Sequence, residues 1–207
     1  MPRSWNKIGT AETIEDSIEI YAKSILKDVK KIKNYKFIFD VANGVTGAYA
    51  KAVYEELGLN FKLINHLPLG SFPNRLPSPT LQHLKNTSKM VQENNFEFGI
   101  TTDADGDRAI FIDNKGKIII GDITGAYFAS RQLELKKGKI VTPINSSDSI
   151  IETAKLNKIK LIWTKVGPPA IVDAIRKNKK DVVFAFEESG KYIWPEILLY
   201  GDSVYSA

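Results

Sequence analysis

Residues 96–113 read FEFGITTDADGDRAIFID, two short apolar runs separated by a bend that holds three aspartates. The runs Phe96–Thr101 and Ala109–Asp113 are rich in β-branched and aromatic residues, which predicts two strands. A third short strand is predicted over Lys117–Ile120, because the intervening residues Asp-Asn-Lys-Gly are typical of a tight turn. The middle of the chain is therefore predicted to form a meander of three strands.

Helix and strand patterns alternate before this meander. Apolar residues from Thr13 to about Val29 recur at helical spacing, and Thr13 with Asp16 matches a capping box. The elements predicted next are a strand over Lys36–Ala42, a helix from Ala48 to Gly58, a strand over Leu59–Asn65, a proline-rich loop over Gly70–Pro79 and a helix from Ser78-Pro79 to about Asn94.

The alternation starts again after the meander. The predicted elements are a helix over Ile123–Leu135, a strand over Lys139–Pro143, a helix over Asp148–Leu156, a strand over Lys160–Thr164, a helix over Ala170–Lys177 and a strand over Val182–Phe186. This order indicates a second, mostly parallel α/β unit. We place the units at residues 1–118 and 119–207. Residues 202–207 begin like a capped helix and stop after one turn, so we expect the second unit to be truncated.

The composition restricts the class of protein. With 207 residues, 43% of them apolar, the chain can bury a substantial core. It has no cysteine and only two histidines, which excludes thiolate chemistry and a histidine-rich metal cluster. No apolar run reaches the roughly 20 residues of a membrane span, and residues 1–6 are too polar for a signal peptide. We therefore expect a cytoplasmic protein with no membrane partner.

The net charge of +5 permits nucleic acid, anionic membranes or phosphorylated small molecules as partners, and selects none of them. The densest basic stretch comprises Lys27, Lys30, Lys31, Lys33 and Lys36. It follows a predicted helix, where cations interact favourably with the helix dipole and keep the surface soluble. We interpret it as a solvated helix end and expect no nucleic-acid partner.

The bend between the first two strands of the meander is a candidate metal site. Asp103, Asp105 and Asp107 alternate along it, so one cation could draw all three carboxylates inward and relieve their repulsion. Hard oxygen ligands favour Mg²⁺ or Ca²⁺, but a calcium loop of the EF-hand type needs glycine where Arg108 stands and glutamate where Asn114 stands. Magnesium is the better candidate. The alternative is a solvated acidic turn.

A second polar loop follows the last predicted strand and reads Phe186-Glu-Glu-Ser-Gly-Lys191. Glu187 and Ser189 are placed at the carboxyl end of a strand, where α/β domains hold ligand-binding groups. A carboxylate and a hydroxyl together suit the hydroxyl groups of a sugar. An ordinary acidic turn remains the alternative for this loop taken alone.

These loops resemble motifs of the α-D-phosphohexomutases, the phosphoglucomutase/phosphomannomutase family. Residues 103–108 resemble the family's Asp-Gly-Asp-Gly-Asp-Arg magnesium loop, and residues 186–191 resemble its Gly-Glu-x-Ser-Gly-His sugar loop, from which Phe186 and Lys191 depart. Residues 163–167 are similar to its Thr-Lys-x-Gly segment, although Pro168 follows where a polar residue is common. Residues 40–44 and 72–79 resemble two further segments, which we interpret as structural.

The resemblance implies two consecutive three-layer α/β units with mixed sheets, as in phosphohexomutase domains 2 and 3. It also implies roles for individual residues: Asp103, Asp105 and Asp107 would hold Mg²⁺, Arg108 would contact the phosphoserine or the substrate phosphate, Glu187 and Ser189 would bind sugar hydroxyls, and Lys165 would lie beside the sugar phosphate. Such an enzyme interconverts hexose 1-phosphate and hexose 6-phosphate, of glucose or mannose, through a phosphoserine and a bisphosphate intermediate.

The family's phosphoserine loop and its C-terminal phosphate-clamp motif do not occur in these 207 residues. We therefore expect this chain alone to be inactive as a mutase, with the domains that carry those motifs as its missing partners. Two alternatives stay open, a subunit of a split mutase and a non-catalytic remnant that binds magnesium or a phosphosugar. The motifs do not separate glucose, mannose and glucosamine as the hexose.

Overall fold

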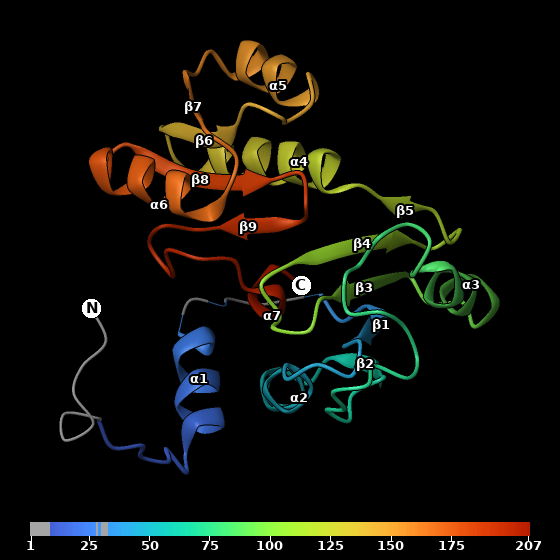
Figure 1. Cartoon of the computed structure of the whole chain (residues 1–207). Coiled ribbons are helices and arrows are strands. Elements are labelled where there is room, and N and C mark those ends of the chain that lie inside the picture. Colours follow the sequence, from blue (N-terminus) through green and yellow to red (C-terminus); the bar gives the residue numbers. More distant parts are fainter. Residues whose placement is uncertain (1–8, 28, 30–32) are drawn as a thin grey trace.

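The computed structural model describes residues 9–27, 29 and 33–207. Among these residues two mixed sheets form, and each is flanked by helices (Figure 1). The first sheet has the order β2-β1-β3-β4-β5 and the second has the order β7-β6-β8-β9. The strands are β1 Lys36–Asp40, β2 Asn60–Ile64, β3 Phe98–Thr102, β4 Ala109–Asp113, β5 Ile118–Ile119, β6 Lys139–Pro143, β7 Leu161–Thr164, β8 Val182–Glu187 and β9 Lys191–Ile193.

Parallel strands occupy one side of each sheet and antiparallel strands the other. In the first sheet β2, β1 and β3 are parallel, and β4 and β5 continue antiparallel. In the second sheet β7, β6 and β8 are parallel, and β9 is antiparallel to β8. This arrangement confirms the predicted α/β class with mixed sheets.

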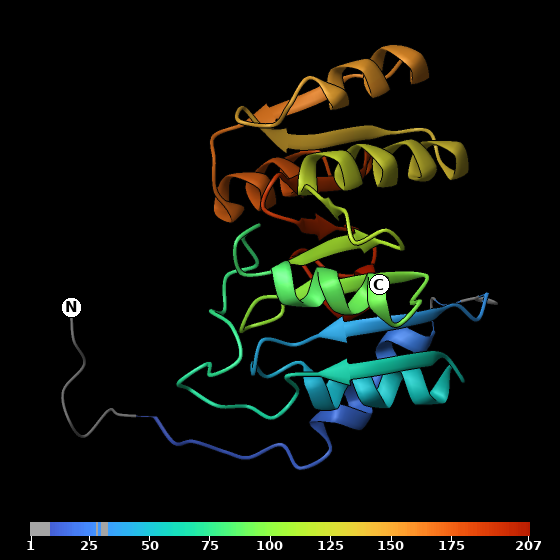
Figure 2. The ribbon, with the colours of Figure 1, turned by 90° about the vertical axis from the view of Figure 1, so that its right-hand side faces the viewer.

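Helices cover both faces of each sheet, as Figure 2 shows from the side. They are α1 Ser17–Leu26, α2 Gly47–Glu56, α3 Lys85–Glu93, α4 Gly121–Leu135, α5 Ser149–Asn157, α6 Pro168–Lys177 and α7 Ser203–Ser206. Neighbouring residues of a strand face opposite sides, so Phe37 and Phe39 of β1 pack with Tyr54 of α2, whereas Ile38 packs with Val91 of α3. The two helical layers therefore enclose the sheet between them.

One apolar core joins the two sheets. Its buried members include Phe39 and Ile100 from the first sheet, Phe184 and Phe186 from the second, and Val204 of α7. The sheets lie edge to edge with β9 beside β4 (Figures 1 and 2), and the N–H of Ala109 donates to the carbonyl oxygen of Gly190 at 2.8 Å. The continuous core fixes the loops of one sheet relative to those of the other. The division of the chain at residue 118 stays a prediction.

Two helix starts differ from the prediction by four residues or more. Helix α3 begins at Lys85, not at Ser78-Pro79, because residues 78–83 form turns, in which the N–H groups of Thr80 and His83 donate to carbonyl oxygens two and three residues earlier. Helix α1 begins at Ser17 after Asp16, and no side chain caps it, so the capping box is wrong. Residues 28 and 30–32 belong to the basic stretch and to the predicted end of the first helix. They lie outside the described residues.

The predicted ends of other elements agree closely. Gly58, with φ +63°, follows α2, and its N–H donates to the carbonyl oxygen of Glu55. Gly116, with φ +78°, closes the turn between β4 and β5 through a bond to Asp113. The described helices include none with the length and apolar character that crossing a membrane requires.

Candidate functional site

The carboxylate-rich bend connects β3 to β4 at the carboxyl end of the parallel strands. Gly106 has φ +77°, and a β-carbon there would lie 1.9 Å from Cγ2 of Thr46, so the bend requires glycine. The turn after β1 packs against the bend, and the N–H of Val45 donates to the carbonyl oxygen of Ala104 at 3.0 Å. A β-carbon on Gly44 would lie 2.3 Å from that same oxygen.

The three aspartates of this bend come together. One carboxylate oxygen from each of Asp103, Asp105 and Asp107 lies within 4.8 Å of the others. Asp103 and Asp107 are buried, and Asp105 is exposed. Burial raises the pKa of Asp103 to about 6, with further contributions from the charges of Asp107 and Asp105. The cluster is therefore costly to keep ionised without a compensating cation.

The donor set suits Mg²⁺. Three carboxylates supply hard oxygen ligands, and the exposed Asp105 leaves one side of the cluster open to other ligands. Oδ1 of Asp107 is buried and has no hydrogen-bond partner among the described residues. A buried carboxylate oxygen without a partner is costly, and a bound cation would satisfy it.

Arg108 closes the bend and keeps part of its side chain in solvent. The backbone N–H of Arg108 donates to Oδ1 of Asp103 at 3.2 Å, and the side-chain Nε of Arg108 lies 3.2 Å from Oδ2 of Asp103. Nε also lies 3.7 Å from Oδ1 of Asp107. The guanidinium thus sits beside the carboxylates, and the side chain is 38% exposed, which suits contact with an external anion.

The second loop turns from β8 into β9 and lies against the first. Gly190 has φ +89°, and a β-carbon there would lie 2.6 Å from the carbonyl oxygen of Ala109. Glu187 is buried at the end of β8. Desolvation raises its pKa, and the charges of Lys191 and Arg108 oppose that shift. Ser189 Oγ is buried without a hydrogen-bond partner among the described residues.

The sequence analysis did not identify Lys191 as part of the site. Lys191 begins β9, its side chain is 3% exposed, and its ammonium donates to Oδ2 of Asp107 at 2.5 Å. It also donates to the hydroxyl of Tyr200 at 3.2 Å. Burial opposes the charge of Lys191, but the hydrogen bond and charge of Asp107 raise its pKa overall. The only signal in the sequence was its departure from the sugar-loop motif.

Lys165 lies apart from these contacts. It is exposed in the loop between β7 and α6, and its carbonyl oxygen accepts a bond from the hydroxyl of Thr164. The same loop reaches the site through Gly167, whose backbone hydrogen bond lowers the pKa of Glu187. This loop is therefore close to the loop between β8 and β9, and the role of the Lys165 side chain stays a prediction.

A buried ion pair anchors the long loop that precedes α3. Nε of Arg75 lies 2.7 Å from Oδ2 of Asp40, and its Nη2 donates to the carbonyl oxygen of Thr102 at 2.6 Å. The side chains of Asn65 and Thr87 donate to the same carboxylate. These contacts give Asp40 and Arg75 a structural role, and they support the end of β3 from which the carboxylate bend departs.

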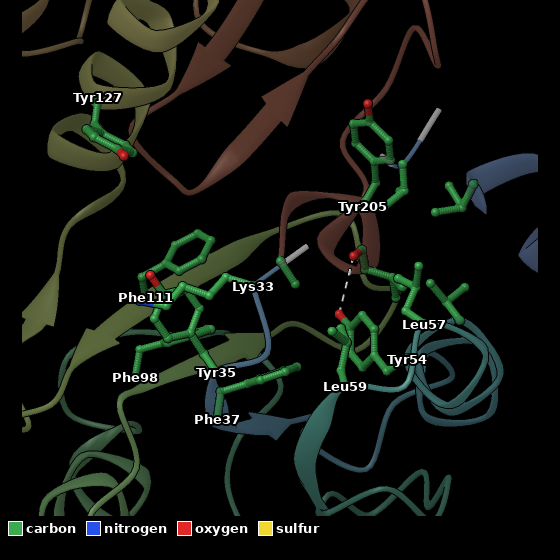
Figure 3. Close-up of a pocket in the computed structure, with 15 residues that line it drawn as sticks. Lys33, Tyr35, Phe37, Tyr54, Leu57, Leu59, Phe98, Phe111, Tyr127 and Tyr205 are labelled. Atoms are coloured by element: carbon green, nitrogen blue, oxygen red, sulfur yellow. Dashed lines mark hydrogen bonds between the residues drawn. The ribbon is translucent and has the colours of Figure 1, made fainter. Parts of the chain in front are cut away.

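An apolar cavity of about 450 Å³ lies away from the carboxylate bend (Figure 3). Phe37 and Phe98, near the beginnings of β1 and β3, line it, whereas the carboxylate bend follows the end of β3. The hydroxyl of Tyr54 donates across it to the carbonyl oxygen of Val204 at 3.3 Å. No aspartate, glutamate or histidine among the described residues lines this cavity, so it does not contribute to the carboxylate site.

Two family models match the chain in the order of its sheets. Residues 19–116 match phosphoglucomutase/phosphomannomutase α/β/α domain II, and residues 120–207 match domain III. The chain belongs to the phosphoglucomutase/phosphomannomutase family. Both loops described above therefore lie within family domains.

Individual relatives agree with this assignment. A phosphoglucomutase/phosphomannomutase of Thermococcus kodakarensis is 35% identical over 203 residues, which cover 96% of this chain and 44% of the relative. A crystal structure of a putative phosphomannomutase from Thermus thermophilus matches with a TM-score of 0.87 at 19% identity, covering 96% of this chain and 46% of the other. The chain thus spans less than half the length of the relatives that it matches.

A more distant structure carries ligands. The N-acetylphosphoglucosamine mutase of Aspergillus fumigatus, solved in complex with GlcNAc-6P and magnesium, matches with a TM-score of 0.62 at 16% identity. The match covers 91% of this chain and 48% of that protein. At this identity the likeness establishes the shared fold.

Proposed function

We propose that this chain supplies the magnesium loop and the sugar loop of a phosphohexomutase, which interconverts hexose 1-phosphate and hexose 6-phosphate. The observation that carries the proposal is the contact between the two loops, made by the Lys191–Asp107 ion pair and the Ala109–Gly190 hydrogen bond. This contact supports the proposal because it brings the loop of Glu187 and Ser189 next to the carboxylate cluster. A phosphosugar held between them would present its phosphate to the metal.

Each proposed residue has a distinct task. Asp103, Asp105 and Asp107 would hold Mg²⁺, which neutralises charge on a phosphoryl group when it is bound. Arg108 would orient a phosphate with its exposed guanidinium.

Two further loops would hold the sugar. Glu187 and Ser189 would form hydrogen bonds with two sugar hydroxyls, and Lys165 would lie beside the sugar phosphate. Glucose phosphate and mannose phosphate are the proposed substrates. The GlcNAc-6P and magnesium bound by the Aspergillus mutase support this ligand class.

The phosphoserine and the C-terminal phosphate clamp are proposed to come from outside these 207 residues, in the same polypeptide or in a partner chain. We therefore expect the isolated chain to bind ligands without measurable turnover. Addition of a chain that carries the phosphoserine domain and the clamp should produce mutase activity. Ligand-dependent stabilisation with no phosphoryl transfer under any such addition would favour a non-catalytic binding module.

Thermal stability with Mg²⁺ and glucose 1,6-bisphosphate tests the site directly. We expect Mg²⁺ to raise the Tm of the wild-type chain, and Asp103→Asn to abolish the rise because a ligand is lost. Asp173→Asn, at an exposed position on α6, serves as the matched control and should keep the rise. Equal responses of both variants would contradict the metal site.

Three variants of the proposed sugar loop, one of them a control, test its role. Glu187→Gln and Ser189→Ala should each weaken the affinity for the bisphosphate by about tenfold, because a polar contact to a sugar hydroxyl contributes about 1 kcal/mol or more. Glu188→Gln should leave the affinity unchanged, since Glu188 is exposed beside them. Isothermal titration calorimetry in saturating Mg²⁺ measures all three affinities.

A further inference from the structure

Lys191 is a buried cation in direct contact with a proposed magnesium ligand. Its side chain is 3% exposed, and its ammonium lies 2.5 Å from Oδ2 of Asp107. The ring of Tyr200 covers the ammonium at 4.3 Å from the ring centroid. A buried ammonium is costly to hold without partners, so this pair is a built part of the site.

The stem of Lys191 is fixed as well as its charge. Glu187 and Lys191 are paired in the antiparallel ladder of β8 and β9. Gly201 packs directly on the stem, since a β-carbon at Gly201 would lie 2.5 Å from Cγ of Lys191. The backbone and this contact leave the ammonium little room to move away from Asp107.

The ion pair changes the charge that a dication would meet. The bend carries three carboxylates, and the positive charges of Arg108 and Lys191 leave it with one net negative charge. Lys191 donates to one oxygen of Asp107, and the other, Oδ1, has no hydrogen-bond partner among the described residues. Like charges repel strongly where water is excluded, so an ammonium in this position opposes a second cation.

We propose that Lys191 is a positioning residue that serves as an internal counter-ion of Asp107, keeping the carboxylate bend ordered without metal and weakening its affinity for Mg²⁺. The inference rests on the proposed function, because it assumes that the bend is a magnesium site. It concerns a residue of this chain that departs from the sugar-loop motif, and it predicts a metal that exchanges readily.

Isothermal titration calorimetry with Mg²⁺ alone tests the proposal on the wild-type chain, Lys191→Met and Lys89→Met. Met keeps the length of the stem and removes the charge. We expect Lys191→Met to bind Mg²⁺ at least tenfold more tightly than the wild type, and to have a lower Tm in metal-free buffer. Lys89→Met removes a charge from an exposed side chain on α3 and should change neither value.

If Lys191→Met binds Mg²⁺ no more tightly than the wild type, the inference is overturned. The proposed function is unaffected by that result as long as the wild-type chain binds Mg²⁺. If neither chain binds Mg²⁺, the metal site and the inference both fall. If Lys191→Met folds only in Mg²⁺, the metal has replaced the ammonium, which supports the proposal.

If Lys191→Met does not fold even in Mg²⁺, the double variant Asp107→Asn/Lys191→Met decides, because it also removes the buried carboxylate that Lys191 pairs with. Recovery of folding in the double variant supports the counter-ion role. Continued failure would overturn the proposal, because removing the carboxylate that Lys191 pairs with would not have relieved the defect.

Discussion

Asp103 of the candidate metal site makes folding less favourable when it is ionised. Asp103 has an ordinary pKa of 3.8, and in the folded chain burial and its acidic neighbours raise the pKa to about 6. The folded chain therefore holds this proton more tightly than the unfolded chain does. The cost of ionising Asp103 develops as the pH rises from about 4 to about 6 and is fully present above pH 6.

This sign predicts a pH-dependent effect of Asp103→Asn in metal-free buffer. The amide does not ionise, so we expect the variant to exceed the wild type in free energy of unfolding by about 1–2 kcal/mol at pH 7.5. The difference should shrink as the pH falls from 6 to 4. Urea unfolding at several pH values measures it, and a difference independent of pH would contradict the raised pKa.

At the scale of elements, the turn between β8 and β9 depends on its glycine. Gly190 combines φ +89° with a β-carbon position 2.6 Å from the carbonyl oxygen of Ala109, so an added methyl group meets both strain and backbone. We expect Gly190→Ala to lower the free energy of unfolding by more than about 2 kcal/mol. Gly70→Ala is the matched control, because nothing lies within 4 Å of its β-carbon position, and it should change stability by less than about 1 kcal/mol. Chemical denaturation of the two variants compares them.

Most elements could be predicted from local patterns, and the exceptions have a tertiary cause. Strand β9 was missed because Lys191–Ile193 is only three residues long, and its burial depends on residues far away in the chain, such as Phe111 and Phe128, which pack against Tyr192. The start of α3 was misplaced because residues 78–83 form turns instead of helix, in a loop that the ion pair of Arg75 with the distant Asp40 anchors. Neither contact leaves a local signal in the sequence.

The candidate site divides in the same way. The alternation of Asp103, Asp105 and Asp107 was visible in the sequence, and the structure brings their oxygens together. The pairing of Lys191 with Asp107 was not, because 84 residues separate the two in the chain. Spacing predicts groups on one loop, whereas contact between two loops depends on how the sheets pack.

At the scale of the whole molecule, the shared core predicts that the two sheets unfold together. Phe39 of the first sheet and Phe184 of the second belong to one cluster of buried side chains. We expect a single calorimetric transition whose calorimetric and van't Hoff enthalpies agree. Phe39→Ala should shift that one transition to lower temperature, at a cost of about 3–5 kcal/mol. Two resolved transitions, only one of them moved by the variant, would contradict a common core.

The hydroxyl of Tyr21 on α1 donates to both carboxylate oxygens of Asp202, at 2.9 and 2.8 Å, across 181 residues of chain. A ribosome that adds about 5–20 residues per second needs roughly 10–40 seconds to make that span. During this interval α1 can pack against α2, but Asp202, the partner of Tyr21, has not yet been synthesised. Helix α1 is thus synthesised long before it can acquire all its native contacts.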